Sequence, residues 1–260
     1  MYHQLKSYIS FYIASTNQHG IHSPFVYDLV TKCFYDKKKD FSDAFKVIQK
    51  YQHTLLSEES TINVTDFGAG SKVFKSNTRM ISAIAKNAGI SNKRAKLLIK
   101  IVSNFKPKHI LEIGTSLGIG TTCLSLGNSK SSITTLEGCP ETAHVAKNYF
   151  KNFKLNNIDI QIGNFKTTLP KVLQNKKYDL IYFDGNHQKE ATINYFEQCL
   201  HTIHNDSIFI FDDIHWSEGM EEAWNYIKNH NKVTVSIDTF QWGIVFFRKE
   251  QPKEHFVIRI

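Results

Sequence analysis

From about residue 108 onward, short apolar runs alternate with amphipathic segments of helical period. The apolar runs that read as strands are residues 109–113, 132–137, 158–162, 178–184, 207–212, 233–237 and 243–247. The amphipathic segments between them are residues 119–126, 140–154, 167–174, 188–203 and 217–230. Apolar strands separated by amphipathic helices predict an α/β fold, in which helices cover both faces of a mostly parallel sheet.

The last two predicted strands are joined only by residues 238–242. A connection this short holds no crossover helix, so the final strand should run antiparallel to the strand before it. The pattern therefore predicts seven strands, of which the last is antiparallel. A further apolar run at residues 256–260 is long enough to add an edge strand.

The first part of the chain has a different pattern, and we predict it to be mostly helical. The predicted helices are residues 1–15, 24–34, 43–56, 81–88 and 92–104. Ser23 and Pro24 suit the start of the second helix, as N-cap and first helical residue. We expect this segment to cap the sheet rather than fold alone. The predicted domains are a cap, residues 1–107, and a sheet domain, residues 108–260.

Composition narrows the class of protein. The chain has 260 residues, with 41% hydrophobic residues and 19 Phe, enough for a large core. No apolar run approaches the roughly 18 residues that span a bilayer, so we expect no membrane segment. The four cysteines lie far apart and form no C-x-x-C pair. We interpret them as reduced thiols of a cytoplasmic protein.

The charge is unevenly distributed along the chain. The net charge is +8, and residues 67–111 contain no acid. The basic residues of this stretch are Lys72, Lys75, Arg79, Lys86, Lys93, Arg94, Lys96, Lys100, Lys106 and Lys108. They could face RNA, an anionic substrate or an acidic partner. We favour a solvated helix face, because no aromatic RNA-binding motif accompanies the charges.

The most informative motif follows the first predicted strand, where residues 109–120 read HILEIGTSLGIG. Gly114, Gly118 and Gly120 allow the backbone to turn sharply and to approach a ligand closely. The helix that follows begins with N–H groups that lack partners. We therefore predict that a nucleotide-like ligand lies over this turn. The spacing differs from the dinucleotide-binding G-x-G-x-x-G.

The motif resembles motif I, E-x-G-x-x-x-G-x-G, of class I S-adenosylmethionine-dependent methyltransferases. The resemblance implies a Rossmann-like methyltransferase sheet with S-adenosylmethionine as cofactor. It places Glu112 near the methionine end of the cofactor and Ser116 among the residues of the turn that contact it.

Two further strand ends complete the predicted cofactor site. Glu137 ends the second strand, 17 residues after Gly120, and is followed by Gly138. A carboxylate at this position can accept hydrogen bonds from both ribose hydroxyls. Gly163 and Asn164 follow the third strand, where the resembled family contacts adenine. Many of its members carry Asp at the position of Asn164, and Asn also suits a simple turn.

Candidate catalytic residues close the fourth and fifth strands. The fourth strand ends in Asp184-Gly-Asn-His187, and the fifth in Asp212-Asp213-Ile-His215. Ligands bind at the carboxyl ends of parallel strands in open α/β sheets. We predict that His187 takes the proton of a methyl acceptor, with Asp184 and His215 as further catalytic candidates. Asp184 is also counted among the cofactor contacts.

The same strand ends suggest a metal site. Two adjacent carboxylates repel each other unless a cation neutralises them, and oxygen ligands suit Mg²⁺. Asp184, Asp212 and Asp213 resemble the metal-binding acids of catechol O-methyltransferase-like enzymes and of metal-dependent sugar O-methyltransferases. The alternative is that one acid caps a helix while the other pairs with Lys or Arg.

These observations predict a methyltransferase that acts on the hydroxyl of a small molecule, with Mg²⁺ as a further cofactor. One alternative is an RNA or protein methyltransferase that docks through the basic segment 72–108. Another is a non-catalytic cofactor-binding module. A second glycine loop, residues 66–71, is interpreted as structural or substrate-facing, because no convincing strand precedes it. The oligomeric state is left open, a homodimer included.

Overall fold

A computed structural model of the chain describes residues 2–65, 67 and 74–260. The chain divides into two compact units. Unit 1 consists of residues 1–36 and 173–260, and unit 2 of residues 37–172. These limits differ from the predicted boundary at residues 107/108, so the division into a cap and a sheet domain stays a prediction.

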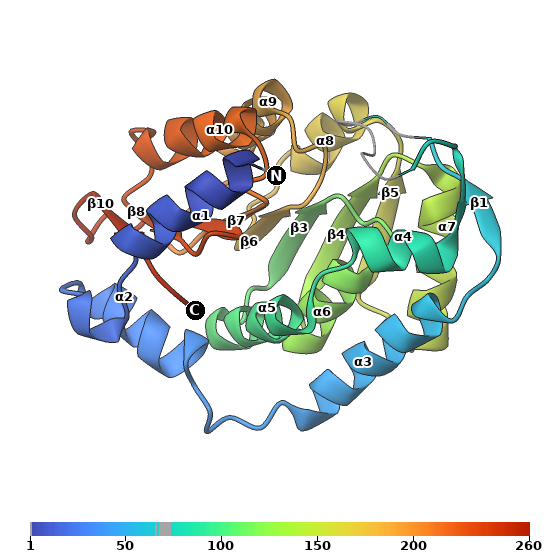
Figure 1. The fold of residues 1–260 in the computed structure, drawn as a ribbon, viewed down its shortest axis with the longest axis horizontal. Helices are drawn as coiled ribbons and strands as arrows, with labels where there is room; N and C mark the ends of the chain where they lie inside the picture. The colour runs from blue at the N-terminus through green and yellow to red at the C-terminus, as the bar shows by residue number, and fades with distance from the viewer. Residues whose placement is uncertain (1, 66, 68–73) are drawn as a thin grey trace. The chain divides into compact units, whose positions relative to one another are not determined.

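Unit 2 is continuous in sequence and contains parallel strands with helices between them (Figure 1). Strands β3, β4 and β5 pair in parallel in that order, as the sequence pattern predicts. The elements of unit 2 are α3 (Ser42–Leu56), β1 (Thr61–Asn63), β2 (Thr78–Met80), α4 (Ile81–Ala88), α5 (Asn92–Phe105), β3 (His109–Ile113), α6 (Ile119–Gly127), β4 (Ser132–Glu137), α7 (Pro140–Asn152), β5 (Ile158–Ile162) and α8 (Phe165–Leu173).

One expectation about unit 2 was wrong. Residues 60–65 were not expected to form a strand, yet β1 lies there and pairs antiparallel with β2. The strand is only three residues long and mostly polar, and its partner lies beyond the glycine loop. The local pattern could not indicate it, because Ile62 is its single buried side chain and its backbone pairs with a strand distant in sequence. The loop itself, apart from Phe67, lies outside the described residues.

Unit 1 joins the two ends of the chain. Its sheet has the order β10-β8-β9-β7-β6. Strand β6 is parallel to β7, β9 is antiparallel to both β7 and β8, and β10 is parallel to β8. The elements of unit 1 are α1 (Tyr2–Ala14), the 3₁₀-helix η1 (Gln18–Gly20), α2 (Pro24–Leu29), the π-helix η2 (Val30–Phe34), β6 (Leu180–Phe183), α9 (Lys189–Cys199), β7 (Ile208–Asp212), α10 (Glu218–Asn229), β8 (Val235–Asp238), β9 (Trp242–Phe246) and β10 (Glu254–Val257).

The N-terminal helix is held by the C-terminal part of the chain. Thr16 forms a parallel bridge to Ile258, with hydrogen bonds from the Thr16 N–H to the Val257 carbonyl and from the Arg259 N–H to the Thr16 carbonyl. Figure 1 shows α1 alongside α10. His3 of α1 lies near the carboxylates of Glu218 and Glu221 on α10, at 4.0 and 3.7 Å.

The predicted fold class is confirmed. The seven expected strands are β3 to β9, the last of them is antiparallel to its neighbours, and β10 is the added edge strand. The N-terminal part is mostly helical, also as predicted. None of the helices among the described residues has the length and apolar character needed to cross a membrane.

Candidate functional site

The glycine turn after β3 has the backbone conformation that the sequence predicts. Gly114 has φ 110° and Gly118 has φ 76°, a region that residues with a Cβ rarely adopt. Ser116 between them is also left-handed, with φ 49°. Two N–H groups, those of Gly114 and Thr115, donate to the Leu136 carbonyl at 3.1 and 3.0 Å. The turn is therefore attached to the end of β4.

Close packing explains why the second glycine of the turn has no side chain. A Cβ at Gly118 would lie 2.5 Å from the Phe150 ring and 2.9 Å from the Tyr51 hydroxyl. Tyr51 is fully buried and donates a hydrogen bond to the Leu117 carbonyl at 2.9 Å. Gly120 lies in the first turn of α6. Helix α3, which carries Tyr51, thus packs against the turn. No motif in the sequence predicted this contact.

Glu137 is linked directly to the glycine turn. Its Oε2 accepts a hydrogen bond from the Ser116 N–H at 2.7 Å, and its Oε1 accepts one from the Cys139 N–H at 2.9 Å. Next to it, a Cβ on Gly138 would lie 2.8 Å from the Phe67 ring. The structure therefore brings Ser116, Glu137 and Gly138 together, although 21 residues separate the first two.

Glu112 has a different environment from the one expected. Its side chain is fully buried, and its Oε2 accepts hydrogen bonds from the hydroxyls of Thr121 and Thr135. Burial raises the pKa of this carboxyl to about 8, against the opposing effect of the two hydroxyls. Oε1 is buried and finds no hydrogen-bond partner among the residues that the structure describes. The group joins β3 to α6 and β4, and its predicted contact with the methionine end stays a prediction.

The end of β5 also meets Glu137. Gly163 has φ 140°, and its N–H donates to the Glu137 carbonyl at 2.9 Å. Asn164 caps α8, because its Oδ1 accepts from the Lys166 N–H at 2.9 Å and its carbonyl from Thr168. The turn role considered for Asn164 is therefore present, and its predicted contact with adenine stays a prediction.

These residues fit a nucleoside cofactor. Three strand ends of one parallel sheet meet at Glu137, and the turn 114–118 presents backbone without side chains at two positions. A carboxylate offers about four acceptor positions, so holding the Ser116 N–H is compatible with accepting from ribose hydroxyls. The arrangement can bind a ribose at Glu137 and leave the glycine backbone in contact with the rest of the ligand.

In unit 1, Asp184 and His187 lie close together after β6. The His187 Nε2 is 3.8 Å from Asp184 Oδ1, and both side chains are about one quarter exposed. His187 also lines a small cavity of about 10 Å³, the size of a single water, together with Tyr195 and Asp212. An imidazole beside a carboxylate can accept a proton and be stabilised as a cation.

The predicted metal ligands do not form a ligand set. Asp212 is buried, and its carboxylate accepts from the Asp213 N–H at 2.9 Å and from the Tyr182 hydroxyl at 3.4 Å. Asp213 has a left-handed backbone, with φ 55°. Across residues 2–65, 67 and 74–260, no three His, Cys, Asp or Glu side chains are placed to hold a metal ion. The Mg²⁺ site of Asp184, Asp212 and Asp213 is therefore not shown.

His215 has two carboxylate partners. Its Nδ1 lies 2.6 Å from Glu221 Oε1 and its Nε2 lies 2.9 Å from Asp238 Oδ2. Burial disfavours the charged ring, but the hydrogen bonds and charges of Asp238 and Glu221 outweigh it and raise the pKa of His215. Both ring nitrogens are engaged, so the contacts favour His187 over His215 as the proton acceptor. The catalytic role of either histidine stays a prediction.

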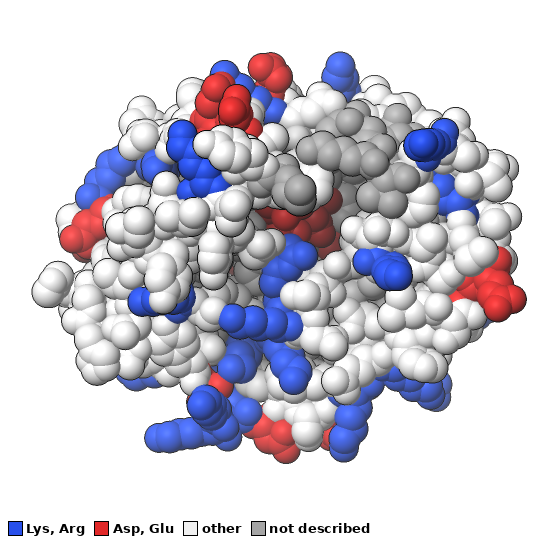
Figure 2. Space-filling model, viewed as in Figure 1, with Lys and Arg blue, Asp and Glu red and all other residues white. Residues whose placement is uncertain are grey.

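The basic segment is partly visible at the surface. Lysine and arginine side chains gather over the position of α5 (Figure 2). Lys93 and Lys96 on this helix are exposed, and the Lys96 ammonium lies 5.0 Å from the centre of the Phe45 ring. Lys72, at the start of the segment, lies outside the described residues. These features describe a solvated helix face and do not identify a polyanion site.

The known proteins that this chain resembles are methyltransferases. Residues 111–214 match the sequence model of a family described as a methyltransferase domain. The catechol O-methyltransferase of Mycobacterium tuberculosis is 25% identical over 127 residues, which are 48% of this chain and 56% of that protein. The chain thus matches only a little over half the length of this curated relative.

Solved structures resemble a larger part of the chain. A methyltransferase from Podospora anserina, bound to S-adenosylhomocysteine, has a TM-score of 0.61 with 16% identity and covers 88% of this chain and 98% of its own. An O-methyltransferase from Bacillus cereus, in complex with S-adenosylhomocysteine, has a TM-score of 0.55 with 19% identity and covers 82% of this chain and 93% of its own. At these identities the similarity shows the fold.

Residues 111–214 thus match a methyltransferase-domain family, and the chain has the fold of solved methyltransferases, with the glycine turn after β3 inside the matched stretch. The resemblance inferred from motif I is confirmed at this level.

Proposed function

We propose that the protein transfers a methyl group from S-adenosylmethionine to a hydroxyl of a small molecule. The observation that carries the proposal is the hydrogen bond between the Glu137 carboxylate and the glycine turn at Ser116. It assembles the nucleoside-binding end of the site from two strands. The names of the relatives, catechol O-methyltransferase among them, support a hydroxyl as the acceptor.

The cofactor supplies a methyl group on a sulfonium, which is already activated for transfer. The protein therefore has to bind the cofactor and the acceptor, orient them, and remove the proton of the acceptor hydroxyl. Glu137 would hold the ribose, and the backbone of the turn at Gly114 and Gly118 would lie against the cofactor. Holding two reactants in near-attack geometry can lower a barrier by about 7–11 kcal/mol. In this proposal His187 takes the acceptor proton, and the neighbouring Asp184 stabilises the resulting imidazolium.

Cofactor binding is tested first, by isothermal titration of S-adenosylhomocysteine into the wild-type protein and a Glu137→Ala variant. Each charged hydrogen bond contributes about 1.5–3 kcal/mol, so the variant should bind at least about tenfold more weakly. Glu59→Gln, an exposed acid of the same unit, serves as the matched control. Equal affinities for wild type and Glu137→Ala would reject the assignment of the ribose site.

The proton acceptor is tested by methyl transfer from labelled S-adenosylmethionine to a panel of phenols and polyols. His187→Ala should lower kcat by about 10²–10⁴-fold while S-adenosylhomocysteine affinity is retained. The kcat of His215→Gln, a change at the other histidine considered as proton acceptor, is measured for comparison. A variant of His187 that keeps full kcat at saturating acceptor would exclude it as the base.

The metal prediction needs its own experiment. Activity is measured after treatment with a chelator, and again after Mg²⁺ is restored, in wild type and in Asp212→Asn. A metal-assisted reaction predicts loss, recovery by Mg²⁺, and no recovery in the variant. Activity that is indifferent to the chelator would refute the predicted dependence on Mg²⁺ and leave the proposed methyl transfer intact.

A further inference from the structure

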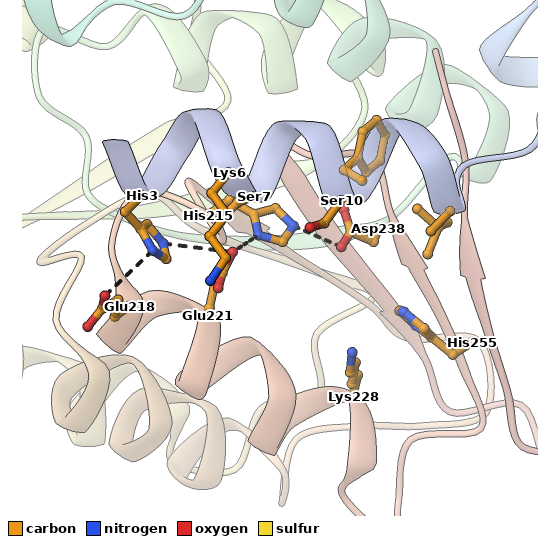
Figure 3. Close-up of a pocket in the computed structure, with 13 residues that line it drawn as sticks. His3, Lys6, Ser7, Ser10, His215, Glu218, Glu221, Lys228, Asp238 and His255 are labelled. Atoms are coloured by element: carbon orange, nitrogen blue, oxygen red, sulfur yellow. Dashed lines mark hydrogen bonds and ion pairs between the residues drawn. The ribbon is translucent and has the colours of Figure 1, made fainter. Parts of the chain in front are cut away.

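A cavity of about 410 Å³ lies within unit 1, under the N-terminal helix. Figure 3 shows α1 along one side of it and Lys228 and His255 pointing toward the helix. We call it the α1 cavity. Its polar lining comes from three parts of the fold: His3, Lys6 and Ser10 on α1, Lys228 on α10, and His215 and His255 from the sheet side.

Three carboxylates line the α1 cavity; Glu218 is largely exposed to solvent, and the other two already have partners. Glu221 Oε1 and Asp238 Oδ2 both bind the ring of His215. Asp238 Oδ1 accepts from the Phe240 N–H at 2.7 Å, and Glu221 also accepts from the Ser7 hydroxyl. His215 therefore fixes both acids, and the acceptor side of the lining is satisfied.

The donor side is not satisfied. Lys228 is half-buried as a residue, and among the described residues no hydrogen bond is found from its ammonium group or from the buried Nε2 of His3. Burial lowers the pKa of Lys228, against the charges of Asp238 and Glu221, which raise it. Burial removes part of the water around Lys228, so a charged hydrogen bond with an acceptor brought by a ligand would be stronger there than at the open surface.

The rest of the wall is apolar. Phe11 and Ala14 on α1 and Val257 on β10 line the same space. A ligand with an acceptor at one end and a carbon skeleton at the other matches this division. The volume lies within the roughly 300–1,000 Å³ range of small-molecule sites.

We propose that the α1 cavity binds a small organic acid, with its carboxylate on Lys228 and its carbon skeleton against Phe11 and Val257. A monovalent anion suits the site better than a divalent one. Glu221 and Asp238 lie close by, and each added negative charge is repelled by theirs. Nothing in the lining belongs to the glycine turn, so this binding is independent of the proposed methyl transfer.

The test is titration of the full-length protein with three probes: benzoate, its neutral isostere benzamide, and inorganic phosphate. Binding is followed by calorimetry and by saturation-transfer NMR. Four variants are compared. Lys228→Met removes the charge and keeps the stem, Lys228→Arg restores it, Ala14→Trp fills the space from an exposed helix position, and Lys232→Met is a control on an exposed lysine outside the cavity.

Benzoate should bind saturably, and benzamide and phosphate at least about tenfold more weakly. Lys228→Met and Ala14→Trp should each weaken benzoate binding by about tenfold or more, while Lys228→Arg and Lys232→Met stay near wild type. All variants should keep wild-type affinity for S-adenosylhomocysteine, which separates this result from a failure of the proposed function. Equal binding of benzoate and benzamide, tighter binding of phosphate, or full binding by Lys228→Met would overturn the proposal.

Discussion

Gly118→Ala perturbs the turn at its most crowded point. The backbone there has φ 76°, and the new Cβ would lie 2.5 Å from two ring carbons of Phe150. Phe150 is buried, so its ring cannot turn aside into solvent. The Tyr51 hydroxyl, at 2.9 Å from the new atom, is a second close contact.

The magnitude follows from two separate costs. A left-handed conformation costs a residue with a Cβ about 1–2 kcal/mol. Forcing an extra methyl into a packed interior costs about 1–3 kcal/mol. The variant should therefore lose about 2–5 kcal/mol of unfolding free energy, a large share of the roughly 5–15 kcal/mol of a natural domain.

The assay is urea unfolding followed by circular dichroism, with Gly219→Ala as the matched control. Gly219 lies in α10, where a Cβ would be 3.5 Å from its nearest neighbour, an ordinary contact. The control should be neutral, or more stable by about 0.5–1 kcal/mol. If Gly118→Ala unfolds at the same urea concentration as wild type, the packing argument for this glycine is refuted.

Three other predictions concern pH and salt. Burial raises the pKa of Glu112 to about 8, so between about pH 4.5 and 8 the folded state keeps a proton that the unfolded state loses. The free energy of unfolding should therefore fall as pH rises through this range. Glu112→Gln should remove this slope when unfolding is measured as a function of pH. The pKa of His215 is also raised, but here the protonated form is the charged one, paired with two carboxylates. Its stabilisation is therefore present below the unfolded pKa of about 6.5 and is lost as pH rises through the folded value. His215→Gln should be less stable than wild type at pH 5.5 and closer to it at pH 9, and a constant difference would contradict this. If the acceptor is a small molecule, methyl transfer should change little between 50 and 200 mM salt, whereas a polyanion docked on the lysines of α5 would lose affinity steeply.

The elements of the sheet could be predicted because their signal is local. Strand β3 begins and ends at the predicted residues 109 and 113, and so do β4 and β5 at theirs. The conformation of the turn after β3 followed from its glycines. The antiparallel β9 followed from a connection too short for a helix.

Contacts between distant residues could not be predicted in this way. His215 was assigned from its place after β7, but its environment is set by Asp238, 23 residues away. Tyr51, on α3, donates a hydrogen bond to the carbonyl of Leu117 in the glycine turn, although 66 positions separate the two residues. Such pairs depend on how elements pack, which periodicity and spacing do not encode.

The bridge between Thr16 and Ile258 has a consequence for biosynthesis. A ribosome delivers residues 37–172 as one uninterrupted stretch, so unit 2 can begin to fold while the remainder is still being made. Helix α1 is translated before unit 2, whereas its partners on α10 and β10 are translated after it. Until then Phe11, which the fold buries, has no docking surface, and a chaperone that shields the nascent helix would find its target there.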